Sequence, residues 1–172
     1  MMLDVAKGAA LIFVAAIVQV TLLSQINVFH GAPDLVLVAL VAVALLRGTI
    51  YGAAAGFAAG FVVDTATLQT LGVTSLLLTI AGYWIGRYGE TTGRDRAHAP
   101  FVSVTVVTVL YSIGALILHY MLGDPVSAQR VLVDALPFKL LFNLALTLPV
   151  YALCRRIFRP PPSGLEEVRL LG

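Results

Sequence analysis

Residues 52–64 read GAAAGFAAGFVVD, so glycine recurs at every fourth position and the run ends on a carboxylate. Positions four apart lie on one face of an α-helix, and Gly52, Gly56 and Gly60 therefore form a stripe without side chains. In a bilayer such a stripe lets a second helix approach closely, and this close packing drives helix association. We predict that these glycines pack an inner helix of a membrane bundle against its neighbour.

Composition is that of a membrane protein. Of the 172 residues, 59% are hydrophobic and 12% are charged, whereas a soluble domain carries about 25% charged residues. The length suits one compact bundle, so we expect a single all-α transmembrane domain over residues 1–158. Residues 159–172 carry three consecutive prolines near their start, which predicts a flexible, extended cytoplasmic tail.

Several function classes lack support in the sequence. The single cysteine, Cys154, excludes an internal disulfide and a cysteine metal site. No nucleophile elbow, zinc-protease motif or phosphate-binding loop occurs, so we expect no enzyme activity, catalytic residue, metal or cofactor. The basic residues lie at segment ends rather than in a patch interleaved with aromatic residues, and we expect no binding to nucleic acid.

Hydropathy divides the chain into six apolar spans. One helix over residues 34–64 would be about 45 Å long, which exceeds a ~30 Å hydrocarbon core and would place Arg47 at its middle. A hairpin at Arg47-Gly48 solves both problems, although the short second span must then be tilted, shielded by neighbours, or matched by a thinner bilayer. The first span is longer than the apolar region of a signal peptide, so we expect it to stay uncleaved. The expected spans cover about 5–28, 33–46, 49–71, 73–88, 100–122 and 137–158.

A short amphipathic helix is predicted before the last span. Apolar residues recur at helical spacing over residues 127–136, opposite a polar face, which is typical of a helix lying in the membrane interface. Pro137 disfavours helical geometry at the residue before it, so we predict a break at Leu136.

The basic residues are distributed asymmetrically between the ends of the spans. With the N-terminus inside, nine of the eleven Lys and Arg residues lie on the inner side, and Arg130 and Lys139 lie toward the outer side. This bias predicts that both termini are cytoplasmic. The polar segment 87–98 is then an inner loop, in which we expect Glu90 to be a solvated charge.

Three polar residues within the spans are candidate site residues. Asp64 either caps a neighbouring helix through its backbone groups or binds an ion or a proton inside the membrane. Lys139 and Asn143 are four apart, on one face of the last span. They either line an outward-facing cavity and bind a carboxylate such as Asp64, or Lys139 extends to the outer interface.

The third span and the segments after it share a spaced pattern, Gly52-x-x-x-Gly56-Phe57-x-x-Gly60-x-x-x-Asp64, then Leu71-Gly72 and Gly82-Tyr83. This pattern resembles that of the bacterial rod shape-determining protein MreD family. Pro33 at the start of the second span, and Pro137 with Asn143 in the last one, are also similar. The resemblance implies that Phe57 and Gly72 belong with the helix-packing glycines.

The resemblance also implies a function without enzymatic activity. The family is an integral component of the lateral cell-wall elongation machinery in the bacterial inner membrane. Its implied partners are the bitopic protein MreC and, through it, the actin-like MreB and the glycosyltransferase RodA with its transpeptidase. The implied fold resembles the substrate-binding subunits of energy-coupling-factor transporters.

That fold likeness supplies an alternative function. A vitamin-binding subunit of such a transporter would share the size, the span count and the glycine-rich helix. It would also need several polar ligand groups near the outer surface, and the outer loops are short and poor in them. A small proton-coupled exporter is a third class, disfavoured because the sequence has no internal repeat or pair of broken helices. We therefore favour a scaffold of cell-wall synthesis.

Overall fold

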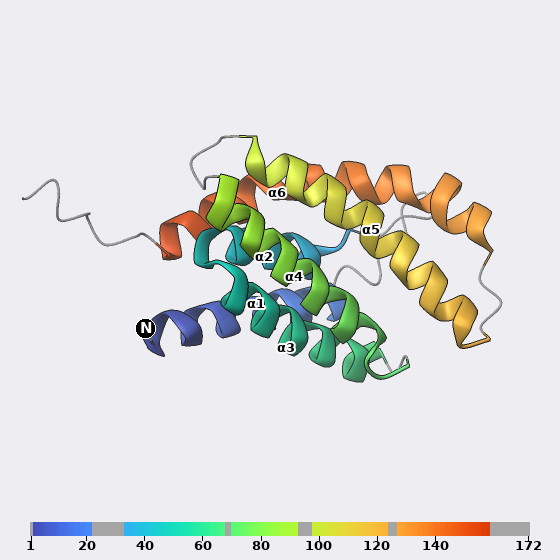
Figure 1. Ribbon diagram of the computed structural model, residues 1–172, viewed down its shortest axis with the longest axis horizontal. Helices are drawn as coiled ribbons and strands as arrows, with labels where there is room; N and C mark the ends of the chain where they lie inside the picture. Colours follow the sequence, from blue (N-terminus) through green and yellow to red (C-terminus); the bar gives the residue numbers. More distant parts are fainter. Residues whose placement is uncertain (1, 22–32, 68–69, 93–97, 124–126, 159–172) are drawn as a thin grey trace, which may run out of the picture.

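The computed structural model of the protein describes residues 2–21, 33–67, 70–92, 98–123 and 127–158. Regular structure in these ranges is helical throughout, without a strand, which confirms the predicted all-α bundle of six helices (Figure 1). The elements are α1 (Met2–Thr21), α2 (Leu35–Arg47), α3 (Thr49–Thr67), α4 (Val73–Thr92), α5 (Ala99–Met121), the π-helical segment η2 (Arg130–Ala135) and α6 (Leu136–Ile157). The predicted tail, and residues 22–28 of the first predicted span, lie outside the described ranges.

Three of the described helices are long and apolar enough to cross a membrane, namely α3, α5, and η2 joined with α6. Two shorter apolar helices, Ala10–Thr21 and α2, accompany them. The chain is therefore a membrane protein built as a helical bundle.

Helix α2 forms the centre of the bundle. Every residue from Val36 to Leu45 is buried, and α2 contacts α1, α3, α4, α5 and α6. Figure 1 shows α2 in the middle, with α1 and α3 on one side and α5 and α6 on the other. A helix that is apolar on all faces is stable only when protein or lipid surrounds it completely. Of the three ways to accommodate this short span, the structure shows shielding by neighbouring helices.

The predicted hairpin between the second and third spans is confirmed at Arg47-Gly48. Gly48 has φ of 92°, a left-handed conformation that glycine adopts without strain. The next helix, α3, begins at Thr49 and ends at Thr67, somewhat before the expected end near Leu71.

Glu90 is exposed, as predicted, but it lies on a helix rather than in a loop, because α4 extends to Thr92 and carries Glu90 on its last turns. The Glu90 carboxylate accepts hydrogen bonds from the Thr49 backbone N–H (2.8 Å) and the Thr49 hydroxyl (2.7 Å). The first N–H groups of a helix lack partners within the helix, and a carboxylate there satisfies them and favours the helix dipole. Glu90 therefore caps α3 and fastens it to α4.

The separate interfacial helix and the break at Leu136 are wrong. The π-helical segment η2 runs directly into α6, and Leu136 has helical dihedral angles of −59° and −43°. Proline has no backbone N–H to donate, and in a continuous α-helix the ring of Pro137 would also clash with the carbonyl four residues earlier. The wider π turn moves each hydrogen bond to the fifth preceding residue, and the Leu136 N–H accordingly donates to the Val131 carbonyl. The helix therefore continues through Pro137 without a break.

Candidate functional site

The glycine stripe of α3 lies against the backbone of α4. Gly52, Gly56 and Gly60 are all buried, and a Cβ atom added to any of them would collide with backbone atoms of α4. The α4 residues that these positions meet are, in the same order, Gly82, Leu78 and Ser75. The contact between Gly52 and Gly82 is reciprocal, since a Cβ atom added to Gly82 would collide with the Gly52 carbonyl. The two helices are therefore in backbone contact along most of their length, as expected of a small-residue interface.

The other two residues assigned to helix packing lie elsewhere. The Phe57 side chain is 59% exposed and stacks on Phe61, with ring centroids 6.4 Å apart, so it faces away from α4. Gly72 lies in the turn before α4 with φ of 97°, and a Cβ atom there would meet nothing within 4 Å. Gly72 is thus needed for its backbone conformation rather than for close packing.

Asp64 is fully buried at the end of α3, where α4 begins. Its Oδ2 atom accepts hydrogen bonds from the N–H groups of Gly72 (2.9 Å) and Ser75 (3.2 Å), and its Oδ1 atom accepts one from Thr74 (3.2 Å). These donors are the N–H groups that the first turn of a helix leaves without internal partners. The geometry is that of the helix-capping interpretation, and it accounts for a carboxylate among apolar helices.

A second buried carboxylate, Asp34, unites Lys139 and Asn143. Lys139 Nζ lies 3.2 Å from Asp34 Oδ2, and Asn143 Oδ1 accepts a hydrogen bond of 2.8 Å from the Asp34 N–H. Asp34 also caps α2, because its Oδ1 accepts from the Leu37 N–H at 3.1 Å. Lys139 and Asn143 therefore do share a face. Lys139 pairs with a carboxylate, but that carboxylate is Asp34 and not Asp64, and Asn143 binds the Asp34 backbone rather than its carboxylate.

The Asp34 cluster, which comprises Asp34, Lys139 and Asn143, also contacts residues of α5. Asn143 is fully buried, and its amide donates to the Thr108 hydroxyl at 3.0 Å. The Lys139 ammonium lies 4.7 Å from the centre of the Tyr111 ring, which adds a cation–π contact. The cluster joins α2, α5 and α6 at the bundle end opposite Arg47.

Sequence reasoning missed Asp34 and Thr108 as members of this cluster. Asp34 follows Pro33 and precedes an apolar run, which is a helix-capping signal, yet nothing local indicates which helix covers it. Thr108 is one of several threonines in its span. Within the described ranges, no three His, Cys, Asp or Glu residues gather as a metal site. What these polar groups do in the structure is join helices.

A comparison with family models finds a match over most of the chain. The model described as rod shape-determining protein MreD matches residues 6–157, most of the chain. The chain belongs to this family.

The MreD match covers both carboxylate clusters and the glycine stripe, and it confirms the resemblance read from the glycine pattern. Membership of the MreD family implies a role in determining rod shape. No curated protein and no solved structure matches the chain. The likeness of the fold to energy-coupling-factor subunits therefore stays a prediction.

Proposed function

We propose that this protein is a non-enzymatic scaffold of the lateral cell-wall elongation machinery in the bacterial inner membrane. The observation that carries the proposal is the MreD family match over residues 6–157. The described polar clusters support it, because Asp64 and Asp34 are occupied with helix N-termini and helix–helix contacts. Side chains so engaged hold a fixed shape, which is what a scaffold needs.

The scaffold binds an MreC-like bitopic protein through that protein's single transmembrane helix. Exposed apolar side chains line the outer face of α5, where Val102, Val106 and Leu110 recur at helical spacing. Lipid is as apolar as these side chains, so helices associate there through shape rather than hydrophobicity. Through this partner the scaffold reaches MreB-like actin filaments and the RodA-type glycosyltransferase with its transpeptidase.

The orientation that we propose places both termini in the cytoplasm. Arg47 ends α2, Arg87 lies near the end of α4, and Arg155 and Arg156 lie in the last turn of α6. These helix ends share one side of the bundle, and a basic side faces the cytoplasm by the positive-inside rule. Lys139, on the opposite side, is paired with Asp34.

Depletion in a rod-shaped host tests the proposal. We expect round, widened cells, rescued by the intact chain and by Ala66→Leu, which changes an exposed residue of α3. We expect no rescue by Gly56→Leu, which separates α3 from α4. Crosslinking in membranes followed by mass spectrometry should recover the bitopic partner. Normal rods after complete depletion, with a transporter ATPase pair among the crosslinked proteins, would instead favour the vitamin-transporter alternative.

A further inference from the structure

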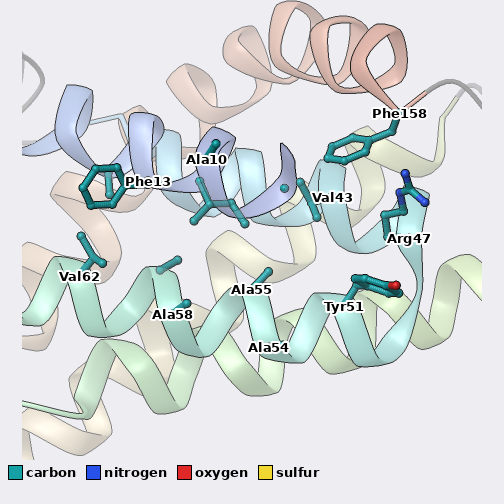
Figure 2. Close-up of a pocket in the computed structure, with 14 residues that line it drawn as sticks. Ala10, Phe13, Val43, Arg47, Tyr51, Ala54, Ala55, Ala58, Val62 and Phe158 are labelled. Atoms are coloured by element: carbon teal, nitrogen blue, oxygen red, sulfur yellow. The ribbon is translucent and has the colours of Figure 1, made fainter. Parts of the chain in front are cut away.

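A groove of about 530 Å³ runs between α1 and α3. Alanines of α3, among them Ala54, Ala55 and Ala58, form one wall, and α1 contributes Phe13 to the other. Figure 2 shows Phe13 toward one end of this α1–α3 groove. The groove is apolar along its length, so its ligand must present an apolar surface.

The two ends of the groove differ in charge. Figure 2 shows Arg47, Tyr51 and Phe158 together at the end opposite Phe13. The Arg47 guanidinium carbon lies 4.9 Å from the centre of the Phe158 ring, a cation–π contact that orients the guanidinium plane. A guanidinium stacked in this way directs its N–H groups along its plane, and these match a phosphate geometrically. The groove thus combines an apolar channel with a cation at one end.

The width of the groove excludes a helix as its occupant. The lining residues of α3 run from Tyr51 to Val62, about 17 Å of helix at 1.5 Å per residue. Dividing the volume of about 530 Å³ by this length gives a mean cross-section of roughly 30 Å², whereas a helix that is about 10–12 Å across with its side chains has a cross-section of roughly 80–110 Å². An extended hydrocarbon chain fits inside this cross-section, and a whole helix does not.

We propose that the α1–α3 groove binds an anionic phospholipid from the leaflet at the Arg47 end. One acyl chain lies along the alanine wall, and the headgroup phosphate meets Arg47. Lys7, Arg155 and Arg156 are exposed at the same end of the bundle and add positive potential at headgroup level. Basic sites between membrane helices favour anionic headgroups for this reason. The inference goes beyond the scaffold function and does not depend on it.

Fluorescence quenching by brominated lipids tests the site in the full-length protein. The chain has one tryptophan, so Trp84→Phe with Phe13→Trp places a single indole in the groove. The protein is reconstituted in bilayers in which phosphatidylglycerol or phosphatidylcholine carries bromine on its acyl chains. We expect the groove indole to report an affinity about fivefold higher for phosphatidylglycerol than for phosphatidylcholine. A difference of this size is what one basic residue at the membrane surface contributes to the binding of anionic lipid.

A matched probe outside the groove gives the control. Phe61 is also an exposed phenylalanine, 52% against 52% for Phe13, and it lies on α3 away from the groove lining. Trp84→Phe with Phe61→Trp should report equal affinities for the two lipids, because this indole meets only the lipid that surrounds the protein.

Substitutions at Arg47 and at Ala58 separate the effect of the charge from that of the apolar channel. Arg47→Gln should reduce the preference at the groove probe to about onefold, and Arg47→Lys should retain part of it. Ala58→Phe should fill the groove and remove the preference for phosphatidylglycerol at the groove probe, whereas Ala66→Phe should leave that preference unchanged. Equal affinities in the parent protein, an undiminished preference in Arg47→Gln, or quenching by neither lipid would overturn the proposal. The comparison of the two lipids in the protein that carries only Trp84→Phe and Phe13→Trp tests the proposal even if a further variant fails to fold.

Discussion

Lys139 Nζ lies 3.2 Å from Asp34 Oδ2, and this ion pair joins the first turn of α6 to the N-terminus of α2. The Lys139 side chain is 21% exposed and that of Asp34 is 11% exposed, so bulk water screens the pair only partly. Removing one partner leaves the other charge in a medium that solvates it poorly. The contact between α2 and α6 therefore depends on both residues together.

Lys139→Met should lower the free energy of unfolding by about 2 kcal/mol, less than the ~3–5 kcal/mol typical of a fully buried pair. Asp34→Asn keeps an oxygen that can accept the Leu37 N–H, and it removes the charge. In the double variant the two losses should not add, since the second substitution no longer strands a charge. Equilibrium unfolding in mixed micelles measures all three variants.

Arg155→Met is the matched control, because Arg155 is an exposed cation at the other end of α6. We expect a change below about 0.5 kcal/mol there, as for most surface positions. Strict additivity of Lys139→Met and Asp34→Asn would show that the pair contributes nothing to the bundle.

Gly56→Ala should destabilise the protein by about 1–3 kcal/mol, the range of an overpacked core. The added methyl group would meet backbone atoms of Leu78 and Thr79, which move only if α4 moves. Gly8→Ala supplies a matched comparison, because its methyl group would meet the end of the Phe158 side chain at 3.6 Å, an ordinary contact distance. In detergent, the melting temperature of Gly56→Ala should lie well below that of Gly8→Ala. Equal stabilities would mean that α3 and α4 are not in backbone contact.

The sequence was sufficient for features with a local cause. The hairpin at Arg47-Gly48 follows from helix length, membrane thickness and one arginine. The glycine stripe predicts a close helix contact because spacing alone places its members on one face. Which helix lies against the stripe was not predicted, because α2 and α4 both adjoin α3 along the chain, and only the structure identifies α4.

Features that depend on long-range packing could not be predicted in this way. Asp34 and Asn143 are 109 residues apart, and only the assembled bundle decides that α6 covers the cap of α2. Glu90 meets Thr49 across 41 residues for a similar reason. The π turn at Pro137 was missed because the expectation allowed only an α-helix or a break.

Single-cysteine labelling tests the proposed orientation. In a Cys154-free background, a membrane-impermeant reagent added outside intact spheroplasts should modify Ser127→Cys and leave Thr91→Cys unmodified. Both positions are exposed at the surface of the bundle, and they lie at opposite ends of it. After permeabilisation both cysteines should react. Labelling of Thr91→Cys from outside would show that the protein has the opposite orientation.

Asp64→Asn separates the capping role of this carboxylate from a role in carrying a proton or an ion. The two oxygens of Asp64 accept three N–H groups between them, whereas an asparagine has one oxygen and an NH₂ group that donates. Either orientation of the amide therefore points a donor at a backbone N–H group. Leaving a buried N–H group without an acceptor costs about 1–3 kcal/mol, so we expect a loss of stability of that size.

The same variant has a distinct expected effect on cell shape. If Asp64 acts only as a cap, Asp64→Asn should lose function in proportion to the loss of folded protein, and growth at lower temperature should restore rods. Asp134→Asn, which changes an exposed carboxylate, should be neutral in stability and in shape. Quantitative immunoblotting of membranes beside cell-width measurements provides the comparison. Normal amounts of folded Asp64→Asn protein in round cells at every temperature would contradict the capping role and favour a proton or ion site.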